Sequence, residues 1–203
     1  AADYGVESVV VASSASVYGS EGPLPKSEDL PVNPESPYAA SKYYSENVAR
    51  QIGYQESISV SALRYFNVFG PRQDPDGEYA AVIPKFIDLL LQGEQPVIFG
   101  DGEQSRDFVF VDDVVEANIQ AAKEDNVEVI NIARGSTVTI NELVAALNET
   151  LYRDIEPIHE DPRPGDIRHS AADISKANES IGFDPDTSFT EGIERTVEWF
   201  RTQ

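Results

Sequence analysis

The sequence predicts an α/β fold built on a largely parallel sheet. Short runs rich in Val and Ile alternate with segments whose apolar residues recur at helical spacing, and this alternation is typical of strands joined by crossover helices. The length of 203 residues fits one compact domain, or one domain with part of a second. The sequence has neither an internal repeat nor a low-complexity segment.

The first third of the chain is expected to hold two buried strands and one long helix. Residues 9–12 form a short β-branched run bounded by polar residues, which is typical of a buried parallel strand. A loop rich in Gly and Pro spans 19–37 and leads into a helix that ends near Glu56. Residues 59–67 are the second expected strand.

The remaining elements are expected to be shorter. Carboxylates at 112–113 should cap a helix that ends near Glu124, because side-chain oxygens accept the free N–H groups of a first turn. Thr139 and Glu142 have the spacing of a capping box and should open another helix. The other expected elements are a loop at 70–77, helices at 79–92, 174–181 and 189–202, strands at 96–99 and 107–111 on either side of a Gly-Asp-Gly turn, and a strand at 127–132.

The composition is strongly acidic. Asp and Glu number 36 against 15 Lys and Arg, so the formal net charge is −21 at pH 7. A surface of this charge repels nucleic acid and anionic membranes, and neither is expected as a partner. The acids are scattered rather than gathered in a tail, which favours adaptation to concentrated salt (a halophilic protein) over an ordinary acidic protein.

Targeting signals are not apparent in the sequence. It has no cysteine, no apolar run long enough to span a membrane and no segment that resembles a signal peptide. The expected location is therefore cytoplasmic. The sequence also lacks methionine and opens on Ala1, as expected of a piece of a longer protein.

The sharpest chemical signal is a Tyr and a Lys four residues apart. Tyr38 and Lys42 stand at the start of the long helix, so both side chains lie on one helix face. A lysine ammonium beside a tyrosine stabilises the phenolate, and a phenolate can act as a general base. The pair alone is a weak signal, since the same spacing occurs by accident on many solvent-facing helices.

A cluster of serines follows the first expected strand directly. In doubly wound sheets, ligands bind outside the carboxyl ends of the strands, and Ser14 would lie there. Its hydroxyl would then bond a substrate hydroxyl next to Tyr38. An ordinary Ser-rich turn is the alternative interpretation.

Five segments, taken in order, carry a family resemblance. They are Ser-Ser-Ala-Ser-Val-Tyr-Gly at 13–19, Ser-Pro-Tyr-Ala-Ala-Ser-Lys at 36–42, Arg-Tyr-Phe-Asn-Val-Phe-Gly-Pro-Arg at 64–72, Gly-Asp-Gly with Ser-Arg-Asp-Phe-Val within 100–109, and Arg-Pro-Gly-Asp at 163–166. Together they resemble the extended short-chain dehydrogenase/reductases. Within these, the pattern is similar to the NAD-dependent nucleotide-sugar epimerase/dehydratase family, closest to its UDP-hexose 4-epimerases, over essentially the whole chain.

The resemblance implies the C-terminal part of a Rossmann-type doubly wound parallel sheet and a smaller α/β domain that binds the nucleotide-sugar. Residues 1–68 would belong to the first and 69–203 mainly to the second, with about 107–133 returning to the first. The family's Gly-rich dinucleotide fingerprint is missing, because the nearest match, at 100–105, has Ser in place of the third Gly. The chain is therefore expected to lack most of the adenosine side of the NAD site and to be inactive alone.

The resemblance also implies a reaction. It is NAD-dependent epimerisation at C4 of a UDP-hexose through a transient 4-keto intermediate. Tyr38 would be the acid/base, Lys42 would bind the nicotinamide ribose, and Ser14 would share the proton path to the sugar O4. The implied contacts to the cofactor NAD are Ser13, Ser14, Tyr38, Lys42, Tyr65 and Phe66.

The implied UDP-sugar site combines cations with apolar side chains. A pyrophosphate needs positive charge and hydrogen-bond donors, and the planar guanidinium of Arg binds phosphate bidentately. Arg106 and Arg163 match such positions, Asp166 would orient the ribose side, and Val97 and Phe99 would border the uracil. The implied substrate contacts are Ser14, Tyr38, Asn67, Val82, Val97, Phe99, Arg106, Arg163, Asp166 and Ser170.

Related reactions of the same family stay open as alternatives. Its 4,6-dehydratases carry an Asp-Glu pair where this chain has Ala15 and Ser16, and its UDP-glucuronate decarboxylases tend to carry a Glu at the second of these positions. Without a carboxylate there, epimerisation is favoured over elimination. A non-catalytic fragment that only binds a nucleotide-sugar is a further alternative.

Substrate size and assembly are also implied. A bulky aromatic at the position of Ser170 is associated in the family with refusal of N-acetylated sugars, so a serine predicts use of UDP-GlcNAc and UDP-GalNAc alongside UDP-Glc and UDP-Gal. Tyr44, Val48 and Ile52 form an apolar stripe that suits a homodimer. The alternative is that the stripe packs on the chain's own sheet.

A metal site is not expected. His159, Glu160 and Asp161 are adjacent but have no second ligand pair at useful spacing. A solvated loop is the expected structure for this segment.

Overall fold

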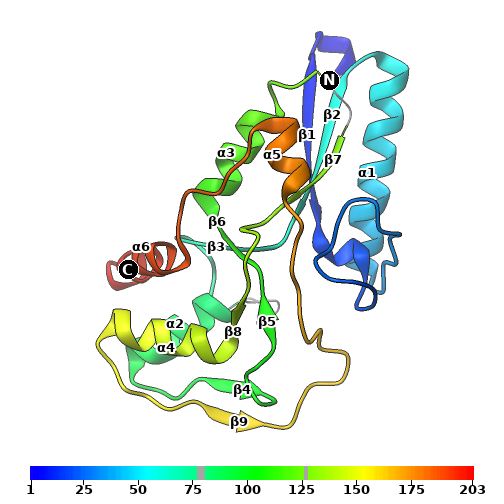
Figure 1. Ribbon diagram of the computed structural model, residues 1–203. Helices are drawn as coiled ribbons and strands as arrows, with labels where there is room; N and C mark the ends of the chain where they lie inside the picture. Colours follow the sequence, from blue (N-terminus) through cyan, green and yellow to red (C-terminus); the bar gives the residue numbers. More distant parts are fainter. Residues whose placement is uncertain (77–80, 126–127) are drawn as a thin grey trace.

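The computed structural model, which describes residues 1–76, 81–125 and 128–203, confirms an α/β fold (Figure 1). The first group of elements comprises β1 (Ser8–Ser14), α1 (Pro37–Glu56), β2 (Ser59–Tyr65), α3 (Val111–Ala121), β7 (Glu128–Ile132) and α5 (Ser175–Ile181), with the short 3-10 helices η1 (Ala2–Tyr4) and η2 (Ala15–Tyr18). Its three strands form a parallel sheet in the order β1-β2-β7. Helix α1 covers one face of this sheet, while α3 and α5 lie on the other side.

The second group occupies the lower half of Figure 1. It comprises β3 (Asn67–Phe69), α2 (Val82–Gln92), β4 (Val97–Phe99), β5 (Ser105–Arg106), β6 (Phe108–Phe110), β8 (Val138–Thr139), α4 (Ile140–Leu151), β9 (Ile158–Glu160) and α6 (Phe189–Arg201). Its strands form two parallel pairs, β3-β6 and β4-β9, and one antiparallel pair, β5-β8. Helices α2, α4 and α6 pack on one another around a buried core that includes Ile87, Leu143 and Ile193.

Helix α1 is defined by its own sequence at both ends. Ser36 is its N-cap, and the Ser36 hydroxyl accepts a hydrogen bond from the N–H of Ala39 at 3.1 Å. At the other end, Ser57 adopts the left-handed conformation and donates its N–H to the carbonyl of Gly53. A Cβ on Gly53 would lie 2.6 Å from the side chain of Val60. The glycine therefore lets the end of α1 approach β2 closely.

Most expected elements are confirmed, with ends shifted by a few residues. The capping box of α4 is present, because Thr139 and Glu142 exchange hydrogen bonds between side chain and backbone. The helix expected from 79 begins at Val82. Residues 79–80 lie outside the described residues, as do Gly77 of the expected loop and Val127 of the expected strand.

The expectation of one continuous strand over 59–67 is wrong. The backbone changes partner after β2, since the N–H of Phe66 donates to the carbonyl of Ile132 at 3.0 Å. The N–H of Asn67 instead donates to the carbonyl of Asp107 at 3.1 Å. The chain therefore leaves the three-stranded sheet at Phe66 and pairs with β6 as β3.

The two carboxylates expected to cap α3 do not cap it. Phe110 is the N-cap, and no side chain bonds there. Asp113 instead accepts a hydrogen bond from the hydroxyl of Thr187 at 3.1 Å, and Asp112 pairs with Arg195. Both acids still lie in the first turn, where the helix dipole favours negative charge.

The segment expected as a solvated loop around His159 is partly a strand. His159 lies in β9, opposite Ile98 of β4. Its Nδ1 is 2.8 Å from the carbonyl oxygen of Gly100. Pairing with a distant strand, which the local sequence does not reveal, explains the difference.

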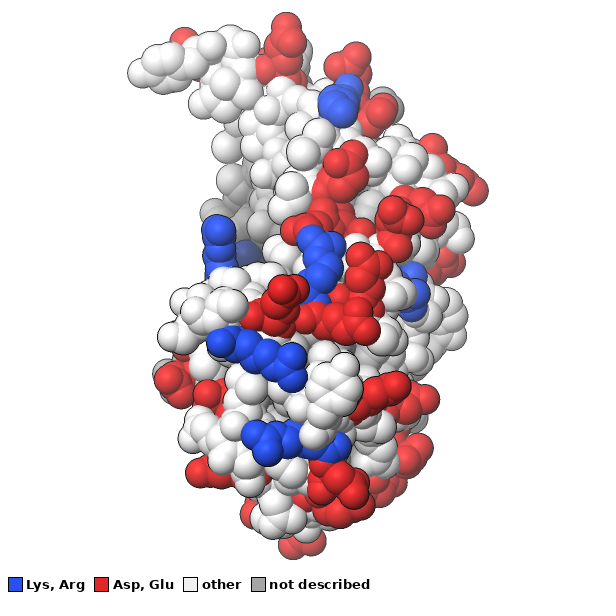
Figure 2. Space-filling view, turned by 90° about the vertical axis from the view of Figure 1, so that its left-hand side faces the viewer, with Lys and Arg blue, Asp and Glu red and all other residues white. Residues whose placement is uncertain are grey.

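The surface is as acidic as the composition requires. On the face drawn in Figure 2, acidic side chains occur from the top to the bottom of the molecule, and the basic ones stand among them. Within the described ranges, no helix combines the length and the apolar character needed to cross a membrane.

Candidate active site

The carboxyl end of β1 carries two serines that point in different directions. Ser14 is the N-cap of η2, and its Oγ accepts the N–H of Ser16 at 3.2 Å. Ser13 is only 2% exposed, and its hydroxyl donates to Glu46. The Ser13 hydroxyl, expected to contact a cofactor, is therefore engaged inside the protein, and Ser14 is the serine that β1 turns toward a cavity.

Tyr38 and Lys42 lie beside the same strand end. The Lys42 ammonium is 5.7 Å from the centroid of the Tyr38 ring and donates to the carbonyl of Ala12 at 3.0 Å. Among the described strands, β1 pairs only with β2, so this helix face borders an open sheet edge. Tyr38 is 57% exposed, and neither Tyr38 nor Lys42 lines the two cavities described next.

The smaller cavity, of about 360 Å³, opens at the carboxyl ends of β1 and β2. Within it, the hydroxyl oxygen of Ser16 is buried and has no hydrogen-bond partner among the described residues. The Tyr65 hydroxyl donates to Asn118 at 2.8 Å. The pKa of Tyr65 is raised, because burial raises it more than that hydrogen bond lowers it. The expected site residues that line this cavity are Ser14, Tyr65, Phe66, Asn67, Arg106, Asp166 and Ser170.

The larger cavity has a volume of about 790 Å³ and adjoins the smaller one. The two cavities share three lining residues: Asn67, Arg106 and Asp166. At its other side, the guanidinium carbon of Arg163 lies 3.6 Å from the centroid of the Phe99 ring, which is the geometry of a cation–π contact. The expected site residues that line the larger cavity are Asn67, Val82, Val97, Phe99, Arg106, Arg163 and Asp166.

Arg106 is the cation at the junction of the two cavities. Its side chain is 17% exposed and pairs with Asp166 at 2.9 Å. Burial lowers the pKa of Arg106, and the charge of Asp166 raises it in part. Its Nη1 also donates to the carbonyl of Ser105 at 2.9 Å, so an anion at the junction would bind the N–H groups that these contacts leave unused.

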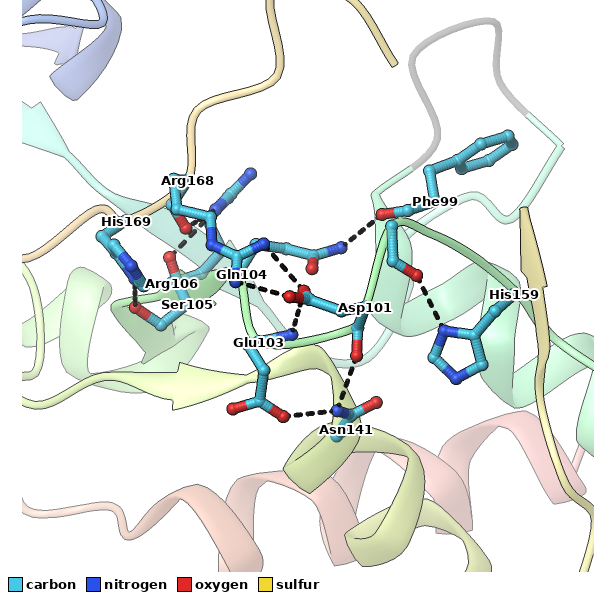
Figure 3. Close-up of polar contacts among 11 residues, drawn as sticks. Phe99, Asp101, Glu103, Gln104, Ser105, Arg106, Asn141, His159, Arg168 and His169 are labelled. Carbon is cyan, nitrogen blue, oxygen red and sulfur yellow. Dashed lines mark hydrogen bonds and ion pairs between the residues drawn. The ribbon is translucent and has the colours of Figure 1, made fainter. Parts of the chain in front are cut away.

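A cluster of polar contacts ties the loop after β9 to the turn after β4 (Figure 3). Arg168 forms two hydrogen bonds of 2.7 Å to the carboxylate of Asp101. Its guanidinium lowers the pKa of Asp101 to about 2. Next to Arg168, the Nδ1 of His169 lies 2.9 Å from the hydroxyl of Ser105. Sequence reasoning missed this ion pair, because 67 residues separate its partners.

Asp107 is a second residue that sequence reasoning missed. It is fully buried, and its carboxylate accepts backbone N–H groups from Arg134 at 2.8 Å and Gly135 at 3.1 Å. Its carbonyl accepts the Asn67 side-chain amide at 3.1 Å. Asp107 therefore orients one residue of both cavities while it holds the segment after β7.

The comparisons with known proteins agree with this fold. The model of the NAD dependent epimerase/dehydratase family matches residues 1–133. The chain belongs to this family. The expected fold class, a Rossmann-type parallel sheet with a smaller α/β part, is thereby confirmed.

Several of the similar proteins are epimerases of nucleotide-sugars. The UDP-glucose 4-epimerase of Mycolicibacterium smegmatis is 42% identical over 201 residues, which cover 98% of this chain and 64% of that protein. The structure of a UDP-N-acetylglucosamine 4-epimerase from Methanobrevibacter ruminantium, in complex with UDP-N-acetylmuramic acid, is 46% identical with a TM-score of 0.95 and covers 100% of this chain and 65% of its own. The Thermus thermophilus UDP-glucose 4-epimerase in complex with NAD is 36% identical with a TM-score of 0.87, over 98% and 66%. The chain thus spans less than two thirds of the curated relative's length.

Proposed function

We propose that the chain supplies the catalytic groups and the nucleotide-sugar site of an NAD-dependent UDP-hexose 4-epimerase. The observation that carries this proposal is the Tyr38–Lys42 pair. Lys42 donates a hydrogen bond to the carbonyl of Ala12, near the end of β1, and at that end Ser14 faces a cavity. We infer that turnover needs a Gly-rich dinucleotide-binding segment, which these 203 residues do not contain. The chain together with such a segment is called the whole protein below.

The residues around the carboxyl ends of β1 and β2 fit the nicotinamide half of NAD. The ammonium of Lys42 stands at an open sheet edge, and Phe66 offers an apolar ring in the smaller cavity. The β-branched residues at 9–11 are only half-buried along that edge, as expected of a strand that accepts another neighbour. Lys42 and Phe66 would hold this half of NAD, and the bound cofactor would supply reversible hydride transfer at C4 of the sugar.

The chain's own residues handle the proton. Tyr38 takes the proton of the sugar O4 and later gives it back, which is general acid–base catalysis. Lys42 stabilises the phenolate of Tyr38, and the Ser14 hydroxyl bridges the phenol and O4. Positions 15 and 16 carry Ala and Ser, so no carboxylate stands there to assist elimination, which favours epimerisation over the dehydratase reaction.

The cavities supply the nucleotide contacts. We assign the pyrophosphate to the junction at Arg106, with Arg163 as a second cation and Asp166 toward the ribose. Phe99 and Val97 would border the uracil in the larger cavity. The hexose would occupy the smaller cavity, against Ser14 and Ser170. Residues 1–68 and about 107–133 would form the cofactor side, and 69–203 would otherwise form mainly the nucleotide side, apart from α5, which packs on β7.

The test is Tyr38→Phe in the whole protein. This change removes only the phenolic hydroxyl. We therefore expect kcat for UDP-hexose epimerisation to fall at least about 100-fold, in line with the usual contribution of a general base. The affinity for UDP, measured by calorimetry, should stay within about twofold, because the phenol touches no nucleotide group.

The matched control is Tyr54→Phe, since Tyr54 lies on the same helix and is 61% exposed. This variant should keep wild-type kcat. Retention of more than a few per cent of activity by Tyr38→Phe would contradict the assignment of the base. A wild-type protein that binds UDP-sugars without turnover would support the non-catalytic alternative, and release of a dehydrated or decarboxylated product would support the related reactions.

A further inference from the structure

Glu46 continues the helix face that carries Tyr38 and Lys42. The three residues are spaced four apart on α1, so their side chains lie in one row. Lys42 donates to the carbonyl of Ala12 at 3.0 Å. One residue further along β1, Ser13 donates its hydroxyl to Glu46. The row therefore fastens α1 to two consecutive residues at the end of β1.

The carboxylate of Glu46 is held from a second strand. Arg64 lies on β2, opposite Ser13 in the sheet register. Its Nε is 2.9 Å from Glu46 Oε1 and its Nη2 is 2.9 Å from Glu46 Oε2. The exposed fractions of the two residues are 4% and 1%. Burial alone lowers the pKa of Arg64, but the hydrogen bonds and charge of Glu46 outweigh burial and raise it, so the guanidinium stays charged.

Arg64 also contacts an aromatic ring that belongs to a hydrogen-bonded network. Its guanidinium carbon lies 4.7 Å from the centroid of the Tyr18 ring. The Tyr18 hydroxyl donates to Asn131 at 2.7 Å, and the Asn131 amide donates to the carbonyl of Lys26 at 3.0 Å. The buried ion pair is thus one end of a polar network that crosses the sheet.

Stability alone does not account for this arrangement. Well-packed apolar residues replace a buried ion pair at little or no cost, because desolvation of the two charges offsets their attraction. A charged network instead fixes direction and distance at each hydrogen bond. Here one oxygen, Oε1 of Glu46, accepts from both Ser13 and Arg64, which joins α1, β1 and β2 at a single point.

We propose that Glu46, held by Arg64, is a positioning residue that fixes the Ser14 hydroxyl relative to Tyr38 through its bond to Ser13. This inference rests on the proposed function. Ser13 and Ser14 are adjacent, so a displacement of the first moves the second. Tyr38 stands on the same helix as Glu46, so one carboxylate sets the distance between the two groups that share the proton. A misplacement of about 1 Å in such groups costs roughly 100-fold in rate.

The first test is Ser13→Ala in the whole protein. It removes the link between Glu46 and β1 and leaves the ion pair with Arg64 in place. We expect kcat to fall about 10- to 100-fold, the range for a displacement of up to an ångström. The KM for the UDP-sugar and the urea midpoint of unfolding should stay near wild type. Ser61→Ala is the matched control, because Ser61 is also 2% exposed but lies on β2 outside the row, and it should keep wild-type kcat.

The second test removes both charges at once. The double variant Glu46→Leu with Arg64→Met keeps an apolar filling and leaves no unpaired charge, so it should fold. Its kcat should fall as far as that of Ser13→Ala. Adding Ser13→Ala to the double variant should lower kcat no further, since all three residues act through the same hydrogen bond between Ser13 and Glu46.

The inference would be overturned by wild-type kcat in Ser13→Ala, by an equal loss in Ser61→Ala, or by losses that add in the triple variant. A fall in kcat that only tracks the folded fraction would also overturn it, because the role would then be structural. An inactive wild-type whole protein would instead overturn the proposed function itself.

Discussion

Asp107 should make the stability of this chain depend on pH. Its carboxylate is fully buried and accepts backbone N–H groups from Arg134, Gly135 and Ala172. Burial raises the pKa of Asp107 from 3.8 to about 6, although those N–H groups and the charge of Arg134 lower it. The perturbation that isolates this effect is Asp107→Asn, which removes the titrating group and keeps the shape.

The sign and size follow from proton linkage. The folded pKa of Asp107 lies above the unfolded one, so the folded protein binds more protons between pH 4 and pH 6, and stability falls as pH rises through this window. The full difference is about 3 kcal/mol, because each pKa unit corresponds to about 1.36 kcal/mol. About half of it, roughly 1.5 kcal/mol, falls between pH 5 and pH 7.5.

The assay is urea unfolding of the chain and of Asp107→Asn at several pH values from 5 to 7.5, at constant ionic strength. This range stays above the isoelectric point of about 4.2. The wild type should lose roughly 1.5 kcal/mol of unfolding free energy relative to the variant as pH rises. Asp161→Asn is the control, since Asp161 is exposed, and its difference from wild type should not change with pH. A pH-independent difference for Asp107→Asn would refute the reasoning.

Three further predictions concern salt, assembly and substrate size. Raising KCl into the molar range should raise the urea midpoint of unfolding, because salt screens the repulsion among 36 acidic residues. A midpoint that does not change with KCl would indicate an ordinary acidic protein without adaptation to salt. Light scattering on the whole protein should give a homodimer at micromolar concentration, because Tyr44 and Ile52 are 70% and 48% exposed in one stripe with Val48; a clean monomer would contradict this. Ser170→Tyr should lower kcat/KM for UDP-GlcNAc relative to UDP-Glc, because a phenol ring would fill part of the smaller cavity. An unchanged ratio of the two kcat/KM values would show that Ser170 is not the residue that admits the acetamido group.

Elements with a local signal could be predicted to within a few residues. The start of α1 at Ser36 and the capping box of α4 at Thr139 depend on groups less than one turn apart. Strands β5, β8 and β9 could not be predicted, because they have two or three residues each and exist through partners far away in the chain. The same cause explains the break at Phe66, where the backbone exchanges one distant partner for another.

The site could be predicted in its composition but not in its connections. Alternation along a strand requires adjacent residues to face opposite sides, so one of Ser13 and Ser14 had to point inward. The local sequence does not show which one, because the answer depends on Glu46 and Arg64. The spacing of four residues from Lys42 to Glu46 repeats that from Tyr38 to Lys42 and is the signal that sequence reasoning missed.

The cations of this acidic protein differ in solvent exposure, and this difference explains how the protein could bind the anionic ligand proposed for it. A net charge of −21 repels a nucleotide at long range, and salt weakens this repulsion because the Debye length is about 10 Å at 0.1 M and about 3 Å at 1 M. Arg168 and Asp101 have side chains that are 53% and 56% exposed, so salt weakens their pair as well. Arg106, at 17% exposure, is screened much less. Concentrated salt should therefore ease the approach of a pyrophosphate more than it loosens the contact at the junction of the two cavities.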